Sequence, residues 1–218
     1  MSVLSSAREL NDLQPMLDGR VRPSLRMTEE EFEKWVGIEN RAEWVDGEVI
    51  LMSPSSLRHN RLTFWFAHLL GEFLARRPLG ELLGIEFMVR LASQRRRRVP
   101  DIFFLSKERA SLLRPNHLEG APDLAIEIVS PDSQSRDRRE KFLEYETAGV
   151  REYWIVDPLS QTFEPYLLGA DGKFALVGES NGQVPSSVLT GFYLKPEWLW
   201  QTPLPAVDPI LHEMGIHG

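Results

Sequence analysis

A strand–helix–strand unit between residues 122 and 157 constrains the fold more than any other part of the sequence. Leu124-Ala-Ile-Glu-Ile-Val129 and Glu152-Tyr-Trp-Ile-Val-Asp157 are short apolar runs of the kind that form buried strands. The segment 133–148 between them has helical spacing, and Gly149 suits the left-handed position that follows many helices. Strands joined through such a crossover pair in parallel. The unit therefore predicts an α/β fold.

Turn signals elsewhere predict antiparallel pairs, so we expect a mixed β-sheet flanked by helices. Asp46-Gly47 lies between two apolar runs and indicates a tight hairpin. Thr28 and Glu31 have the spacing of a capping box at a helix start. The remaining expected elements are a long amphipathic helix over 57–77, strands over about 81–91 and 99–105, and a pair over 163–168 and 173–177.

The chain of 218 residues is long enough for one sizeable core. We expect an extension over 1–26, one domain over 27–200 and a tail over 201–218. Cysteine is absent, which excludes disulfides, thiolate metal sites and a catalytic cysteine. No signal peptide or apolar run of membrane-spanning length is evident, so we expect a cytoplasmic protein without a membrane partner. The net charge of −7 disfavours a protein that coats nucleic acid, but not an enzyme that meets DNA locally.

Three residues carry the strongest chemical signal. Asp101 opens an apolar run, Glu127 lies within one, and Lys141 shares the inner stripe of the helix that follows. A carboxylate in such a strand is costly to bury without compensation. If the two strands are neighbours, Asp101 and Glu127 can bind one Mg²⁺ or Mn²⁺ ion, with Lys141 assisting the attack of water. Alternatively, Asp101 caps a strand and Glu127 forms a buried ion pair with Lys141.

An ordered set of segments then resembles a known pattern. It comprises Arg41-Ala-Glu43-Trp-Val-Asp-Gly47, Met52-Ser-Pro54 with His59, Val99-Pro-Asp101-Ile102, Ala121-Pro-Asp-Leu-Ala-Ile-Glu127-Ile-Val-Ser-Pro131, Asp137-x-x-x-Lys141-x-x-x-Tyr145 and Gly149-Val-x-Glu-Tyr-Trp-Ile-Val-Asp-Pro158. Together these segments, which span about residues 27–178, resemble the Uma-type restriction-endonuclease family of the PD-(D/E)XK nuclease superfamily.

The resemblance implies a restriction-endonuclease-like α/β core and a magnesium-dependent endonuclease acting on DNA. Asp101 and Glu127 take the metal-binding positions, and the main-chain carbonyl near Ile128 completes the ligand set. The usual lysine two residues after the glutamate is replaced by Val129. Lys141 resembles a migrated replacement on the next helix.

Two further residues belong to the amino-terminal motif of the resemblance. Glu43 could bind metal or water, or it could be a surface or capping residue. His59 could contact phosphate or move a proton, or it could be an ordinary core histidine. Asp137, one turn before Lys141, could hold that lysine. The basic run Arg95–Arg98 could contact a phosphate backbone, or it could form a solvated hairpin tip.

Two other functions stay open from the sequence. One is a catalytically silent nuclease fold that only binds nucleic acid. The other is a structural homodimer that meets its partner through exposed aromatic residues such as Trp198 and Trp200.

Overall fold

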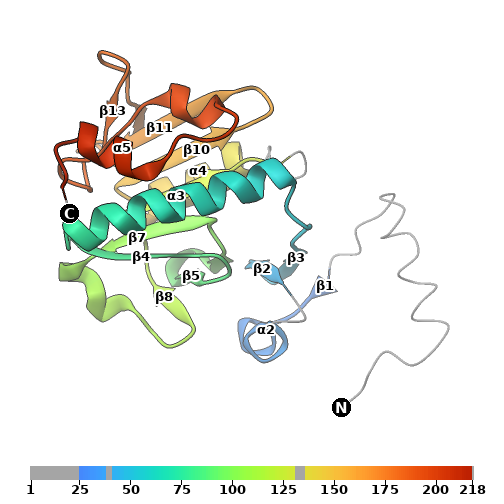
Figure 1. Ribbon diagram of the computed structural model, residues 1–218. Helices are drawn as coiled ribbons and strands as arrows, with labels where there is room; N and C mark the ends of the chain where they lie inside the picture. Colours follow the sequence, from blue (N-terminus) through green and yellow to red (C-terminus); the bar gives the residue numbers. More distant parts are fainter. Residues whose placement is uncertain (1–24, 38–40, 131–135, 218) are drawn as a thin grey trace.

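The computed structural model describes residues 25–37, 41–130 and 136–217, without the side chains of Arg136 and Asp137. Most of the expected amino-terminal extension, residues 1–24, lies outside this range. Two large mixed sheets and a long central helix dominate the described part of the chain (Figure 1). The prediction of a mixed α/β architecture is confirmed, but where one sheet was expected the described strands form two six-stranded sheets and a small pair, β13 (Val184–Pro185) with β14 (Tyr193–Leu194).

The strand–helix–strand unit forms the centre of one of these sheets, the second sheet. Its order is β12 (Phe174–Leu176), β11 (Thr162–Leu168), β10 (Glu152–Asp157), β9 (Leu124–Ile128), β7 (Ile102–Ser106) and β4 (Gly80–Gly84). Strands β9 and β10 pair in parallel, and the other neighbours are antiparallel. The parallel pairing predicted for the two apolar runs is therefore confirmed.

The other sheet, the first sheet, carries the hairpin. Its order is β1 (Leu25–Arg26), β3 (Glu48–Leu51), β2 (Ala42–Val45), β6 (Arg96–Arg98), β5 (Met88–Leu91) and β8 (His117–Glu119). Asp46 and Gly47 turn between β2 and β3 with positive φ values of 49° and 91°. Such values are typical of the tight hairpin turn that this pair predicts.

The strand expected over 81–91 is wrong as a single element. The chain leaves β4 at Gly84 and enters the first sheet as β5. Gly84 has a φ of +152°, and a Cβ there would lie 2.4 Å from the carbonyl oxygen of Asp101. Ile85 and Glu86 also have positive φ values, of 48° and 83°. This turn ends β4 beside Asp101 and passes the chain from one sheet to the other.

The helices start and end close to where their sequence signals lie. Four α-helices and four shorter helical segments are described: α2 (Glu29–Trp35), α3 (Leu57–Arg76), α4 (Phe142–Ala148), α5 (Val207–Glu213), the 3₁₀ segments η1 (Ala92–Gln94), η2 (Lys107–Leu112) and η4 (Pro196–Trp200), and the π-helical turn η3 (Arg136–Lys141). Thr28 and Glu31 form the expected capping box. Ser56 caps α3 by accepting from the main-chain N–H of His59, and Gly149 ends α4 with a φ of 83°.

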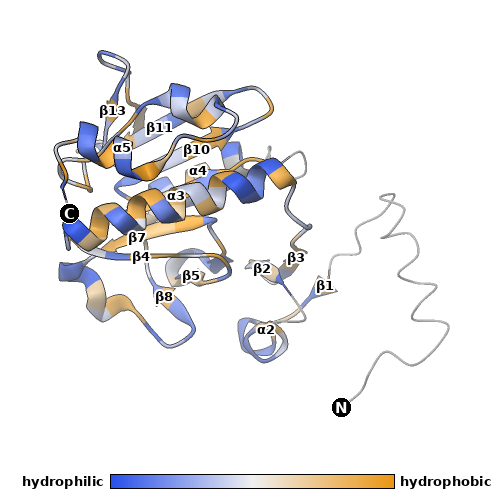
Figure 2. Ribbon diagram, viewed as in Figure 1, coloured by the Kyte–Doolittle hydropathy of each residue, from blue (hydrophilic) through white to orange (hydrophobic). Residues whose placement is uncertain are grey.

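Alternation along the strands divides the core between two layers. On β9, Ile126 and Ile128 pack with α3 and the carboxy-terminal segments, whereas Ala125 packs with Tyr145 of α4 and with the first sheet. Figure 2 shows that β7 is hydrophobic along its length, whereas α3 carries both hydrophobic and hydrophilic residues. Glu127 therefore projects with Ala125, away from α3.

The segment expected as a weakly patterned tail contributes to the core. Within it, Val207, Ile210 and Leu211 of α5 are buried in the same cluster as α3. Trp198 is also part of this cluster, with an exposed fraction of 5%, and Trp200 packs against it. The expectation that these tryptophans are exposed for a partner is wrong, because η4 folds back onto the core. None of the described helices has the length and apolar character needed to cross a membrane.

Candidate active site

Asp101 and Glu127 lie on neighbouring strands. Asp101 directly precedes β7, and Glu127 is in β9. The two strands are antiparallel with Ile102 opposite Ile126, so the next register step brings Asp101 opposite Glu127. Residues directly opposite in such a pair project from the same face. The strand order thus brings together the two carboxylates that the sequence singled out.

The Asp101 carboxylate is held through one of its oxygens. Its Oδ2 accepts a hydrogen bond of 2.7 Å from the main-chain N–H of Ile128 and lies 3.2 Å from Nε2 of His59. Within the described residues, Oδ1 has no hydrogen-bond partner. The N–H and C=O groups of one strand residue point to the same side, so the Ile128 carbonyl also projects toward Asp101. One carboxylate oxygen and one carbonyl are therefore available on this side of β9.

Glu127 is bound by the helix that follows its strand. Its Oε1 accepts a 3.0 Å hydrogen bond from the Tyr145 hydroxyl and lies 2.9 Å from Nζ of Lys141. Both members of this ion pair are buried, with side-chain exposures of 3% and 5%. Lys141 therefore points inward as its position on the helical stripe predicted. The buried ion pair considered as an alternative is present in the structure.

Glu43 joins the same charge cluster from the first sheet. It lies inside β2, not before it, and is 1% exposed. Its Oε1 is 3.3 Å from Lys141 Nζ and accepts from the main-chain N–H of Val99 at 3.1 Å. Its Oε2 accepts from the Arg98 guanidinium group at 2.8 Å. The interpretation of Glu43 as a surface or capping residue is wrong, because it lies in an inner strand of the first sheet and pairs with two buried cations, Arg98 and Lys141.

Burial and neighbouring charge shift two pKa values at this cluster. Burial raises the pKa of the Tyr145 hydroxyl well above its usual value, and the nearby Glu127 and Glu43 carboxylates raise it further. Burial alone would lower the pKa of Arg98, but Glu43 and Glu144 outweigh it and raise that pKa. Tyr145 is therefore a neutral donor and Arg98 a fixed cation at ordinary pH.

All the residues proposed for the site line a single small pocket of about 90 Å³. They are Glu43, His59, Asp101, Glu127, Ile128 and Lys141. The side chain of Asp137, which was expected to hold Lys141, lies outside the described residues. His59 is nearly buried and lies on the inward edge of α3, where its Nε2 reaches Asp101. Because a carboxylate only accepts, this ring nitrogen carries the hydrogen.

The pocket fits a hard divalent cation by charge and by donor type. Three carboxylates line it, from Glu43, Asp101 and Glu127, against the cations Lys141 and Arg41. Arg41 is itself paired with Glu86 at 2.8 Å, and Arg98, which binds Glu43, is shared with Glu144. The carboxylates of this region therefore outnumber its cations. Carboxylate and carbonyl oxygens are the ligands that Mg²⁺ and Mn²⁺ prefer. Among the described residues, no group of three His, Cys, Asp or Glu side chains is arranged to hold a metal ion.

The role of the basic run Arg95–Arg98 was not predicted from the sequence. Arg98 is fully buried, and its guanidinium group binds Glu144 at 2.7 and 2.8 Å. Arg97, 3% exposed, points to the opposite face of β6 and binds Glu29. The solvated hairpin tip is therefore wrong for these two residues. The signal in the sequence was the two-residue period of a strand, because consecutive arginines such as Arg96–Arg98 of β6 place alternate side chains on opposite faces.

Comparison with known proteins identifies similar chains. A family model, Uma2, described as putative restriction endonuclease, matches residues 29–197. The uncharacterized protein sll1609 of Synechocystis sp. is 26% identical over 137 residues, which cover 62% of this chain and 77% of that protein. The crystal structure of a putative nuclease belonging to DUF820 from Anabaena variabilis has a TM-score of 0.66 at 21% identity, covering 80% of this chain and 97% of the other. That similarity shows a shared fold.

Proposed function

The chain belongs to the Uma2 family, described as putative restriction endonuclease, and on this premise we propose that it is a metal-dependent endonuclease that hydrolyses phosphodiester bonds in DNA. The observation that carries the proposal is the small pocket, where Asp101 and Glu127 from adjacent strands meet Lys141 and the Ile128 main chain. The nuclease-type fold shared with the Anabaena protein supports it.

Asp101, Glu127 and the Ile128 carbonyl would hold Mg²⁺ or Mn²⁺. When bound, such an ion activates water for attack and neutralises phosphate charge. The protein's own groups orient these ligands: the Ile128 N–H fixes Asp101, and the Tyr145 hydroxyl fixes Glu127. Ligands held in this way need little rearrangement when the substrate arrives.

Lys141 and His59 supply the remaining chemistry in this proposal. Lys141 Nζ lies between Glu127 and Glu43, so it can move toward a phosphate oxygen only by giving up part of a buried ion pair. Glu43, anchored by Arg98, positions Lys141. His59 Nε2 carries a hydrogen beside Asp101 and can donate it to a phosphate or leaving oxygen.

A catalytically silent nuclease fold is the second candidate. It is favoured by the Glu127–Lys141 ion pair, which neutralises the glutamate without any metal. This protein would bind nucleic acid but not cleave it. The two candidates differ in cleavage, so cleavage is the decisive measurement.

The test is a cleavage screen of single- and double-stranded DNA and of RNA with Mg²⁺ or Mn²⁺, comparing the protein with Glu127→Gln and Lys141→Ala. We expect cleavage by the unaltered protein and its loss in both variants. Lys141→Ala removes the cation beside Glu127 and one of the two cations that hold Glu43, so it also costs about 3–5 kcal/mol of folding stability. Circular dichroism of each variant separates lost chemistry from lost fold. Full cleavage by Glu127→Gln would contradict the proposal.

A further inference from the structure

A second, larger pocket adjoins the candidate active site. Its volume is about 680 Å³, and it lies over the first sheet between the end of α2 and the turn at residues 114–117. It shares Arg41, Met52 and Val99 with the small carboxylate pocket. The two pockets therefore adjoin at these three residues, which lie at the ends of β2, β3 and β6.

The lining of the large pocket suits a flat, partly polar ring. Val36, Met52 and Met88 give apolar surface, and Met side chains adapt to the face of an aromatic ring. Asn116 at the rim has both a donor and an acceptor in its amide. A volume of this size is within the range of small-molecule sites, about 300–1,000 Å³. Apolar faces with a few amide and guanidinium groups are the chemistry that recognises an exposed nucleobase.

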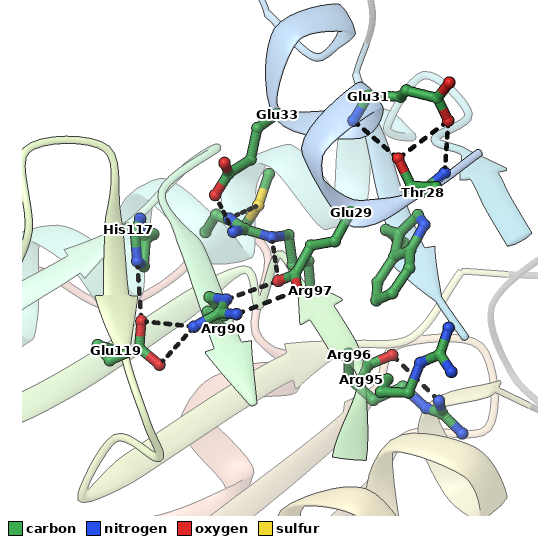
Figure 3. Close-up of polar contacts among 12 residues, drawn as sticks. Thr28, Glu29, Glu31, Glu33, Arg90, Arg95, Arg96, Arg97, His117 and Glu119 are labelled. Carbon is green, nitrogen blue, oxygen red and sulfur yellow. Dashed lines mark hydrogen bonds and ion pairs between the residues drawn. The ribbon is translucent and has the colours of Figure 1, made fainter. Parts of the chain in front are cut away.

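The charged groups that line this pocket leave a positive charge at its rim. Each carboxylate in its lining already has a cation: Glu33 pairs with Arg97, and Glu86 pairs with Arg41. Figure 3 shows the Arg97 guanidinium group between Glu29 and Glu33 of α2. Arg114 at the rim donates only to main-chain carbonyls and has no carboxylate partner within the described part of the chain. Its positive charge is available for a phosphate.

The wall formed by α2 is fixed in place without a ligand. Arg90 binds Glu29 at 2.6 Å and Glu119 at 3.0 Å, and Arg97 binds Glu29 at 2.8 Å (Figure 3). This network ties α2 to three strands of the first sheet. Phe32 of α2, fully buried, adds apolar contact with the same sheet. Small-molecule sites are usually formed before the ligand binds, and a wall held in place in this way is typical of them.

We propose that the large pocket receives one unpaired nucleotide of the DNA strand being cut, next to the scissile phosphate. This inference rests on the proposed function and names its substrate class. Bases in an intact duplex are stacked and paired, so a base enters a side pocket only from a single strand or after it has been swung out. The protein therefore prefers single-stranded or locally unpaired DNA to intact duplex.

The test measures DNA binding in EDTA, which needs no cleavage. Fluorescence anisotropy compares a labelled single strand of about 15 nucleotides with the matching duplex. Asn116→Trp places a large ring at the pocket mouth, and Ser111→Trp, exposed on the same segment but outside the pocket, is its matched control. We expect Asn116→Trp to weaken single-strand binding about tenfold. Ser111→Trp should leave it unchanged, and duplex binding should be weaker throughout.

A second variant tests the phosphate contact separately. Arg114→Ala should reduce the slope of log affinity against log salt concentration by about 0.7, the value for one phosphate of a single strand. Arg77→Ala, exposed at the far end of α3, is the control and should not change the slope.

Equal binding of single strand and duplex, unaffected by Asn116→Trp and Arg114→Ala, would overturn the inference while leaving any cleavage by the protein untouched. Conversely, a protein that cleaves nothing but shows the expected binding pattern would contradict the proposed endonuclease and support the pocket.

Discussion

Two Pro-Asp pairs lead into neighbouring strands of the second sheet, and they have different surroundings. Pro100-Asp101 precedes β7, and Pro122-Asp123 precedes β9. Each pair follows a small or branched apolar residue and is followed by another, so the local sequences are almost equivalent. Even so, Asp101 lines the small pocket, whereas Asp123 is bound within the framework of the fold.

Asp123 is fully satisfied by the protein. Its Oδ2 accepts from the main-chain N–H of Ser106 at 2.8 Å, and its Oδ1 lies 3.0 Å from Arg109 and 3.3 Å from Arg151. It is completely buried. Asp101 is bound through Oδ2 alone and lines a pocket beside Glu127. A Pro-Asp pair therefore indicates a functional site only where the described part of the fold leaves one oxygen of the aspartate without a hydrogen-bond partner.

The largest expected difference between the two aspartates is in cleavage. Asp101→Asn removes a carboxylate from the proposed metal site, so the cleavage rate should fall about a thousandfold. Asp123→Asn should retain at least half of the rate, because Asp123 does not line the pocket. Initial rates on one DNA substrate, at saturating Mn²⁺, make the measurement. Equal losses in the two variants would mean that the comparison reflects folding and not chemistry.

The second difference is in stabilisation by metal. A ligand at about one hundred times its dissociation constant adds about 2.7 kcal/mol to the free energy of unfolding. For a chain of this size that is a rise in melting temperature of about 5–10 °C. Mg²⁺ should produce it in the unaltered protein and in Asp123→Asn but not in Asp101→Asn. A similar rise in Asp101→Asn would place the metal elsewhere.

The smallest difference is in acid stability, and it concerns Asp123. Burial opposes ionisation of Asp123, but the Ser106 N–H and the Arg109 guanidinium group outweigh it and lower its pKa below the ordinary value of 3.8. A lowered pKa gives stability that is present above pH 3.8 and is lost as the pH falls through the folded-state value. Asp123→Asn should therefore be less stable at pH 6 by about 1–2 kcal/mol.

Urea unfolding at several pH values measures this effect. The stability difference between the unaltered protein and Asp123→Asn should shrink once the pH is below 3.8. A difference that stays constant down to pH 2 would show that the carboxylate contributes through packing and not through its charge.

Much of the fold follows from local patterns. The apolar runs of β9 and β10, the helical stripe of α3 and the Asp46-Gly47 turn each determine their own element, because side-chain period and turn chemistry are properties of adjacent residues. The break at Gly84 was missed, because the apolar run continues across it. Only the close approach of the Asp101 main chain shows why the strand stops there.

The candidate site divides in the same way. The sequence determined that Glu127 shares a face with Ala125 and that Lys141 lies on the inner stripe of its helix. The tertiary structure decided that Asp101 stands opposite Glu127, and that Glu43 comes from another sheet to meet Lys141. It also turned Arg98 inward, because Glu144, distant in the chain, supplies its counter-charge. Alternation depends on neighbours along the chain, but compensation of a buried charge depends on partners that only folding brings within reach.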